Sequence, residues 1–249
     1  TAMEFGCFVN AYQSGGMEEW PQVVNRMRLA GMTTGVIFTK SANDLVFQVD
    51  TMIEAGMCPK GLPLLVINES SERREPIVQA PSGWAPGEME GVLDMFCSAT
   101  SRTNYPGQWP ELIPYGPDEP GKGQVGADVS GCAGVRDGFH QLGLKTGTAV
   151  EGANVMDCLP YFDLIAIATE DGYNTREQVR ALREAGKHFW IYNAALPNYQ
   201  PEALAYEMGR WCALGPEAYL FWSWGRLQEK PYREHWLQAF ERFVSGVPR

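Results

Sequence analysis

Strand-like runs alternate with helix-like segments along the whole chain, and this alternation limits the possible folds more than any other feature. Strands are expected at Glu4–Ala11, Thr34–Thr39, Leu62–Ile67, Glu111–Gly116, Lys145–Val150, Asp163–Thr169, His188–Asn193 and Ala218–Ser223. Helices are expected at Glu18–Ala30, Asn43–Ala55, Met89–Ala99, Gly126–Leu142, Thr175–Ala185, Pro201–Ala213 and Arg233–Val244. Because a helix between two strands forms the crossover that parallel strands require, the pattern predicts a parallel α/β sheet covered by helices.

The number of these units favours a closed barrel over an open sheet. Eight strand–helix units in 249 residues match a (β/α)8, or TIM, barrel, which has about 250 residues. The fifth helix is expected to be reduced, because only the short segment Asn154–Tyr161 stands in its place. A doubly wound open sheet is the alternative, but no Gly-x-Gly-x-x-Gly follows the first strand. We therefore expect residues 1–249 to form a single barrel domain.

Composition narrows the classes of partner. The formal charge is −10 and the pI about 4.9, so a nucleic acid partner is not expected. No apolar run approaches the roughly 20 residues that span a bilayer, so no membrane partner is expected either. The N-terminus lacks the pattern of a signal peptide. Because a removed signal peptide leaves no trace, both a cytoplasmic and a secreted location stay open, as does the oligomeric state.

Cysteines and histidines predict neither a metal site nor a nucleophile. The six cysteines show no Cys-x-x-Cys spacing and stand mostly in apolar stretches: Cys7, Cys58, Cys97, Cys132, Cys158 and Cys212. We expect structural thiols, with one disulfide possible. The three histidines, His140, His188 and His235, do not follow strand ends, which argues against a Ser–His–Asp triad and a two-histidine metal site. No cofactor is expected.

The tetrapeptide Pro117-Asp-Glu-Pro120 places two adjacent carboxyl groups between prolines, directly after the fourth strand-like run. On its own, such a sequence is typical of a solvated turn. Proline fixes its own φ and favours an extended residue before it, so a stiff pair is expected. Like charges this close resist ionising together, which makes one carboxyl a candidate proton carrier. In a barrel, catalytic groups lie at the C-terminal ends of strands, which is where this pair falls.

The other predicted strand ends add polar and aromatic side chains but few cations. The candidate substrate-binding residues are Asn10, Tyr12, Lys40, Asn68, Glu151, Glu170, Tyr192, Asn193, Trp222 and Trp224. Apolar faces of sugars stack on aromatic rings, and hydroxyls bond to carboxylates and amides, so a neutral carbohydrate is the expected ligand. Several of these residues also have a simpler explanation: the two tryptophans could fill the barrel core, Lys40 could form an ion pair, and the glutamates could be ordinary loop residues.

On these residues the chain resembles glycoside hydrolase family 123 and the related DUF4091 barrels. The resemblance is carried by Tyr115-Gly-Pro-Asp-Glu-Pro120, Phe189-Trp-Ile-Tyr-Asn193, Pro197, Arg210-Trp211 and Phe221-Trp-Ser-Trp224. It implies a β-N-acetylgalactosaminidase that works by substrate assistance. In that mechanism Glu119 would be the general acid and then the base, and Asp118 would hold the N–H of the 2-acetamido group.

The same resemblance gives looser expectations for other residues, and it leaves rivals open. Tyr192 would bond the acetamido oxygen, and Trp222 or Trp224 would form the floor of the sugar subsite. One rival is a glycosidase on other sugars that pairs Glu119 with Glu170 or Glu151. Another is a barrel that binds glycans without cleaving them. Because neighbours on a strand face opposite ways, Asp118 and Glu119 can serve one sugar only if the strand has ended before them.

Overall fold

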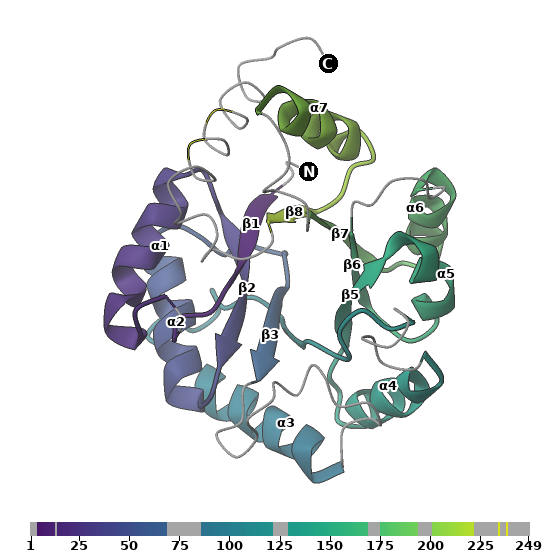
Figure 1. Cartoon of the computed structure of the whole chain (residues 1–249). Helices are drawn as coiled ribbons and strands as arrows, with labels where there is room; N and C mark the ends of the chain where they lie inside the picture. Colours follow the sequence, from purple (N-terminus) through teal and green to yellow (C-terminus); the bar gives the residue numbers. More distant parts are fainter. Residues whose placement is uncertain are drawn as a thin grey trace.

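The computed structural model describes residues 4–12, 14–68, 86–121, 129–168, 175–193 and 201–221, together with Glu234 and Gln238. Eight strands form one parallel sheet in the order β4-β3-β2-β1-β8-β7-β6-β5, and the helices lie outside it (Figure 1). The strands are β1 (Glu4–Val9), β2 (Thr34–Thr39), β3 (Leu64–Asn68), β4 (Leu112–Pro114), β5 (Gly147–Glu151), β6 (Leu164–Ala168), β7 (His188–Asn193) and β8 (Ala218–Phe221). This arrangement confirms the predicted (β/α)8 barrel.

The helices are close to those predicted. They are α1 (Trp20–Leu29), α2 (Ala42–Glu54), α3 (Pro86–Thr100), α4 (Cys132–Gln141), α5 (Val155–Cys158), α6 (Thr175–Glu184) and α7 (Pro201–Cys212). Short 3-10 turns, Met17–Glu19, Val129–Gly131 and Gly152–Asn154, precede α1, α4 and α5. With four residues, α5 is the reduced helix that the sequence predicts. Of the predicted last helix only Glu234 and Gln238 lie within the described residues.

The segment that follows β4 forms backbone hydrogen bonds with β5, and these hydrogen bonds close the barrel. β4 has only three residues, and Tyr115 forms a parallel bridge with Gly147. The N–H of Gly116 donates to the carbonyl of Gly147 at 2.6 Å, and the N–H of Glu119 donates to the carbonyl of Ala149 at 3.0 Å. In the middle of the order, β1 pairs with both β2 and β8, so the sheet is continuous from β4 to β5. The open-sheet alternative is therefore wrong, because both edges of the sheet meet.

Alternation of side chains divides the hydrophobic core into two layers. One layer fills the barrel interior: Phe8, Val36, Leu62, Leu65, Ile67, Ile113, Tyr115, Ala149, Leu164, Ala166, Ala168, Trp190, Tyr192, Ala218 and Leu220. The other lies between the strands and the helices, where Ile165, Ile167 and Ile191 meet residues such as Phe139 and Leu182. Small residues on β5, β6 and β8 leave room inside for the large rings of Trp190 and Tyr192.

All six cysteines are free thiols, so the disulfide that the sequence allowed is absent. Cys7, Cys132 and Cys158 are buried. Burial raises the pKa of Cys58 and of Cys158 to about 12, so both thiols stay protonated near neutral pH and are poor nucleophiles. His140 bonds to Asp163 at 2.8 Å and His188 to Glu217 at 2.9 Å, as expected for structural histidines.

No helix in the described residues is long and apolar enough to span a membrane. Within the same residues, no group of three or more His, Cys, Asp or Glu side chains could hold a metal ion.

Candidate functional site

The segment that carries Asp118 and Glu119 leaves the regular strand before it reaches them. β4 ends at Pro114, and Glu119 has a φ of 44°, in the left-handed region that is uncommon for residues other than glycine. The expectation that Pro120 would hold Glu119 in an extended shape is therefore wrong. The bonds of this segment to β5 outweigh the local preference. Because the strand has ended, the opposite facing of strand neighbours no longer separates the two carboxyl groups.

The rigidity of the segment comes from β5 as well as from the prolines. The hydroxyl of Thr148 donates to the carbonyl of Pro117 at 2.5 Å, between the backbone bonds that Gly116 and Glu119 make to β5. Thr148 is fully buried, so this hydrogen bond is shielded from water. A side chain at Gly116 would lie 2.9 Å from the ring of Phe162, so glycine is needed there for the segment to approach β5.

Each of the two carboxylates accepts a hydrogen bond from a tyrosine of the barrel interior. The hydroxyl of Tyr115 donates to Oδ1 of Asp118 at 2.5 Å. The hydroxyl of Tyr192, on β7, donates to Oε1 of Glu119 at 2.5 Å. A hydrogen bond to a charged acceptor, such as the Asp118 carboxylate, is shorter and stronger than a neutral one. Both tyrosines are buried while both carboxyl residues are half-buried, so the acidic pair lies where the packed interior ends.

One aromatic residue of β1 packs against both tyrosines. The ring of Phe8 meets that of Tyr115 edge-on at 6.2 Å between centroids, and that of Tyr192 at 5.9 Å. Such edge-to-face contacts are favourable and directional. Burial, and then the charge of Asp118, raise the pKa of Tyr115 well above the usual value of a phenol. Tyr115 therefore stays a hydrogen-bond donor across the pH range in which most enzymes work.

Tyr12 and Lys40 lie together at the start of α2. The hydroxyl of Tyr12 donates to Oδ2 of Asp44 at 2.7 Å and accepts the N–H of Lys40 at 3.0 Å. The ammonium group of Lys40 lies 4.1 Å from the centre of the Tyr12 ring, a cation–π contact. Asn10 is buried, and its Oδ1 accepts the N–H of Tyr12 at 3.0 Å. These contacts account for all three residues structurally, and their binding of substrate stays a prediction.

The remaining predicted residues divide into those placed at strand ends and those outside the described part. Asn68 and Glu151 are the last residues of β3 and β5, and both are half-buried. Asn193 ends β7, and only its backbone is described. Glu170, Trp222 and Trp224 lie outside the described residues.

Sequence reasoning missed three residues of this site: Phe8, Tyr115 and Thr148. Tyr115 belongs to the motif that singled out the acidic pair, but a tyrosine at the end of a strand gives no sign of its partner. Its place in the interior follows from the alternation on β4, since Ile113 is also an interior residue. Phe8 and Thr148 look like ordinary strand residues, and only the closure of the barrel brings them to the site.

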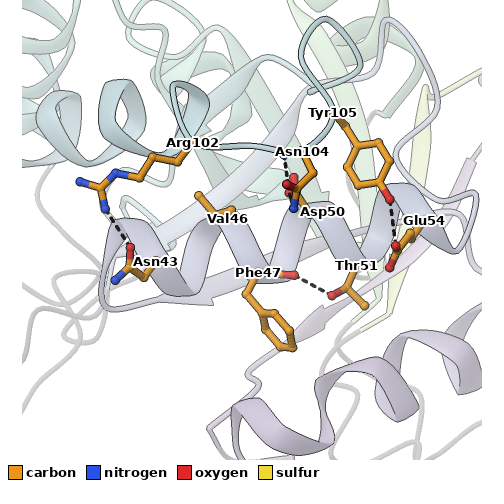
Figure 2. Close-up of a pocket in the computed structure, with 9 residues that line it drawn as sticks. All are labelled: Asn43, Val46, Phe47, Asp50, Thr51, Glu54, Arg102, Asn104 and Tyr105. Carbon is orange, nitrogen blue, oxygen red and sulfur yellow. Dashed lines mark hydrogen bonds between the residues drawn. The ribbon is translucent and has the colours of Figure 1, made fainter.

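A separate surface pocket of about 460 Å³ lies along α2, against the loop that follows α3. Figure 2 shows Arg102 reaching Asn43 at one end of α2 and Tyr105 reaching Glu54 at the other. Between them Asp50, only 7% exposed, accepts hydrogen bonds from the loop. The donors are the hydroxyl of Thr103, the indole of Trp109, and the backbone and side chain of Asn104. Asp50 thus holds the loop on α2, and Trp109 belongs to this structural network.

Asp50→Ala should lower the free energy of unfolding by about 1.5–3 kcal/mol, because it removes a buried carboxylate that accepts several part-buried hydrogen bonds from the loop. Glu54→Ala is the matched control. It removes a neighbouring carboxylate that binds Tyr105 at the exposed surface and should cost less than about 1 kcal/mol. Urea denaturation followed by circular dichroism measures both. Equal losses in the two variants would contradict the role assigned to Asp50.

Comparison with known proteins supports the fold but identifies no family. No family model matches the chain, and no curated protein matches its sequence. A mandelate racemase/muconate lactonizing enzyme from Roseiflexus sp. superposes with a TM-score of 0.54 at 11% identity, over 88% of this chain and 55% of that one. Tryptophan synthase from M. tuberculosis gives 0.54 at 9% identity, over 98% and 92%. GH5_18 from Streptomyces cattleya, in complex with GlcNAc, gives 0.52 at 11%, over 99% and 82%.

These likenesses establish the barrel fold alone. The chain spans only about half the length of the mandelate racemase-like structures that it matches. Barrels of this kind carry unrelated chemistries at the same strand ends, so function has to be argued from the residues of the site.

Proposed function

We propose that this protein is a glycoside hydrolase that removes a terminal β-linked N-acetylhexosamine, with N-acetylgalactosamine as the expected sugar. One observation carries the proposal: Asp118 and Glu119 stand side by side at the end of β4, each bonded to a buried tyrosine. The resemblance of Tyr115-Gly-Pro-Asp-Glu-Pro120 to glycoside hydrolase family 123 supports it. The similar GH5_18 barrel, solved with GlcNAc, is consistent with a carbohydrate ligand in this fold.

The proposed reaction has two steps, and the substrate supplies the nucleophile. In the first, the acetamido oxygen bonds to the anomeric carbon while the glycosidic bond breaks. Glu119 gives its proton to the departing oxygen, and Asp118 holds the acetamido N–H as positive charge develops on that group. In the second step, Glu119 takes a proton from water as the water oxygen bonds to the anomeric carbon. The ring formed by the acetamido oxygen opens, and the β configuration is retained.

An adjacent pair suits this division of labour better than the ordinary two-carboxylate mechanism. In that mechanism the carboxyl groups stand about 5–5.5 Å apart on opposite sides of the scissile bond, or about 6.5–9.5 Å apart in inverting enzymes. Sequence neighbours on one loop approach the sugar from the same side. Glu151, at the end of β5, is the described residue that could serve as the second carboxylate in the rival mechanism.

Asp118→Asn should lower kcat/KM on a chromogenic N-acetyl-β-galactosaminide by about 10²–10³, because the amide cannot stabilise the charge that develops on the acetamido group. Glu151→Gln is the comparison variant and should lose far less activity, because Glu151 is a candidate for substrate binding and takes no part in the proposed chemical steps. Proton NMR of the first product should show the β anomer. The opposite ranking of the two variants, or turnover of glycosides that lack the acetamido group, would favour the rival mechanism. Glycan binding without turnover by the wild type would make the barrel a binding protein.

A further inference from the structure

We infer that Tyr115 is a positioning residue for Asp118, and that its hydroxyl sets the orientation in which Asp118 meets the acetamido group of the substrate. The inference rests on the proposed function and deepens it. It assigns a task to a residue that does not itself reach the sugar. The geometry that carries it is the 2.5 Å hydrogen bond from the Tyr115 hydroxyl to Oδ1 of Asp118.

The ring of Tyr115 cannot easily change its place. It is 2% exposed, it packs edge-on against Phe8, and its backbone N–H donates to the carbonyl of Val66 on β3 at 2.9 Å. A side chain held on several sides keeps its rotamer, so its hydroxyl is a fixed point beneath the acidic pair. Asp118 has a short side chain on a half-buried loop, and a fixed donor restricts the directions in which its carboxylate can point.

The two carboxylates take their donors from different strands. Tyr115 follows β4, whereas Tyr192 belongs to β7, across the barrel interior. Phe8 touches both rings. Each carboxylate can therefore be oriented separately, although Asp118 and Glu119 are neighbours in sequence. Two neighbouring groups with different tasks need this independence, because a shared donor would couple their orientations.

The raised pKa of Tyr115 supports the same role. Because burial and the nearby charge of Asp118 disfavour the phenolate, the hydroxyl keeps its proton well into alkaline solution. The donor to Asp118 is consequently present throughout the range in which the reaction can be assayed. A fall in activity within that pH range then reflects the titration of groups other than Tyr115.

Tyr115→Phe tests the inference, since it removes the hydroxyl and keeps the ring. Turnover of a chromogenic N-acetyl-β-galactosaminide should fall about 10- to 100-fold, the usual effect of losing a hydrogen bond to a charged group. Tyr105→Phe is the matched control, because the Tyr105 hydroxyl donates to Glu54 at 2.9 Å on the outer surface. It should keep wild-type turnover. Circular dichroism should show both variants folded.

A second readout separates positioning of Asp118 from a general structural effect. With a dinitrophenyl leaving group, which needs no proton, a defect in acid catalysis shrinks, whereas a defect in acetamido attack persists. The Tyr115→Phe deficit should therefore be the same for dinitrophenyl and phenyl substrates, and it should add nothing once Asp118 is already Asn. Wild-type turnover in Tyr115→Phe beside a deficient Asp118→Asn overturns this inference alone. A wild type that hydrolyses no N-acetylhexosaminide overturns the inference and the proposed function together.

Discussion

Glu119→Gln should lower the turnover of a phenyl N-acetyl-β-galactosaminide by about 10²–10⁴, the usual contribution of a general acid. Glutamine keeps the shape of the side chain and an oxygen that can accept the Tyr192 hydroxyl, now 2.5 Å from Oε1. It has no acidic proton for the departing oxygen and cannot take one from water. The variant should therefore bind substrate like the wild type, with a similar KM, and fail in the chemical steps. Steady-state kinetics on the purified protein measures both quantities.

Two comparisons sharpen this test. A dinitrophenyl leaving group should restore much of the first step in Glu119→Gln, because that group departs without protonation. Glu54→Gln alters the other glutamate that accepts a tyrosine hydroxyl within the described residues, and it should keep wild-type activity. Wild-type turnover in Glu119→Gln on the phenyl substrate would end the assignment of Glu119 as the acid. The barrel fold itself does not depend on this result.

The fold could be predicted from sequence because each element carries its own local signal. β2 and β7 have the predicted bounds, and the short α5 follows from a segment too cramped for a full helix. Gly31, Gly56, Gly143 and Gly186 each follow directly on a predicted helix, and all have positive φ, the conformation in which glycine ends a helix. Closure between β4 and β5 has no such signal, because it depends on bonds between segments that are about 30 residues apart.

The two carboxylates of the candidate site stand out in the sequence, whereas the side chains that hydrogen-bond to them do not. The proline-bracketed pair stands out in the sequence, and its position after the fourth strand places it at the barrel mouth. The conformation of Glu119 contradicts the local rule for residues before proline, since bonds to Ala149 and Tyr192 fix it from other strands. Tyr192 was expected to bond a substrate, and in this structure its hydroxyl bonds Glu119. Such pairings depend on which strands become neighbours, and the hydrophobic periodicity of the sequence does not determine this.

Trp190→Ala should lower the free energy of unfolding by about 3–5 kcal/mol, as expected when a large aromatic side chain is removed from a packed core. The ring is fully buried in the barrel interior, among small residues of the neighbouring strands such as Ala166 and Ala218. Those neighbours cannot fill the space that it leaves. Because Trp190 stands two residues before Tyr192 on β7, activity should fall too. Urea denaturation gives the change in stability.

Trp190→Phe and Trp20→Phe form a matched pair that separates volume from hydrogen bonding. Both indoles are fully buried. The Nε1 of Trp20 donates to the carbonyl of Gln48 at 3.1 Å, whereas that of Trp190 has no partner among the described residues. Trp20→Phe should therefore cost about 1 kcal/mol more than Trp190→Phe, the usual net value of a hydrogen bond. Equal costs would mean that the Trp190 indole has a polar partner inside the barrel. A cost below about 1 kcal/mol for Trp190→Ala would mean that the interior is not the packed layer on which Tyr115 and Tyr192 rest.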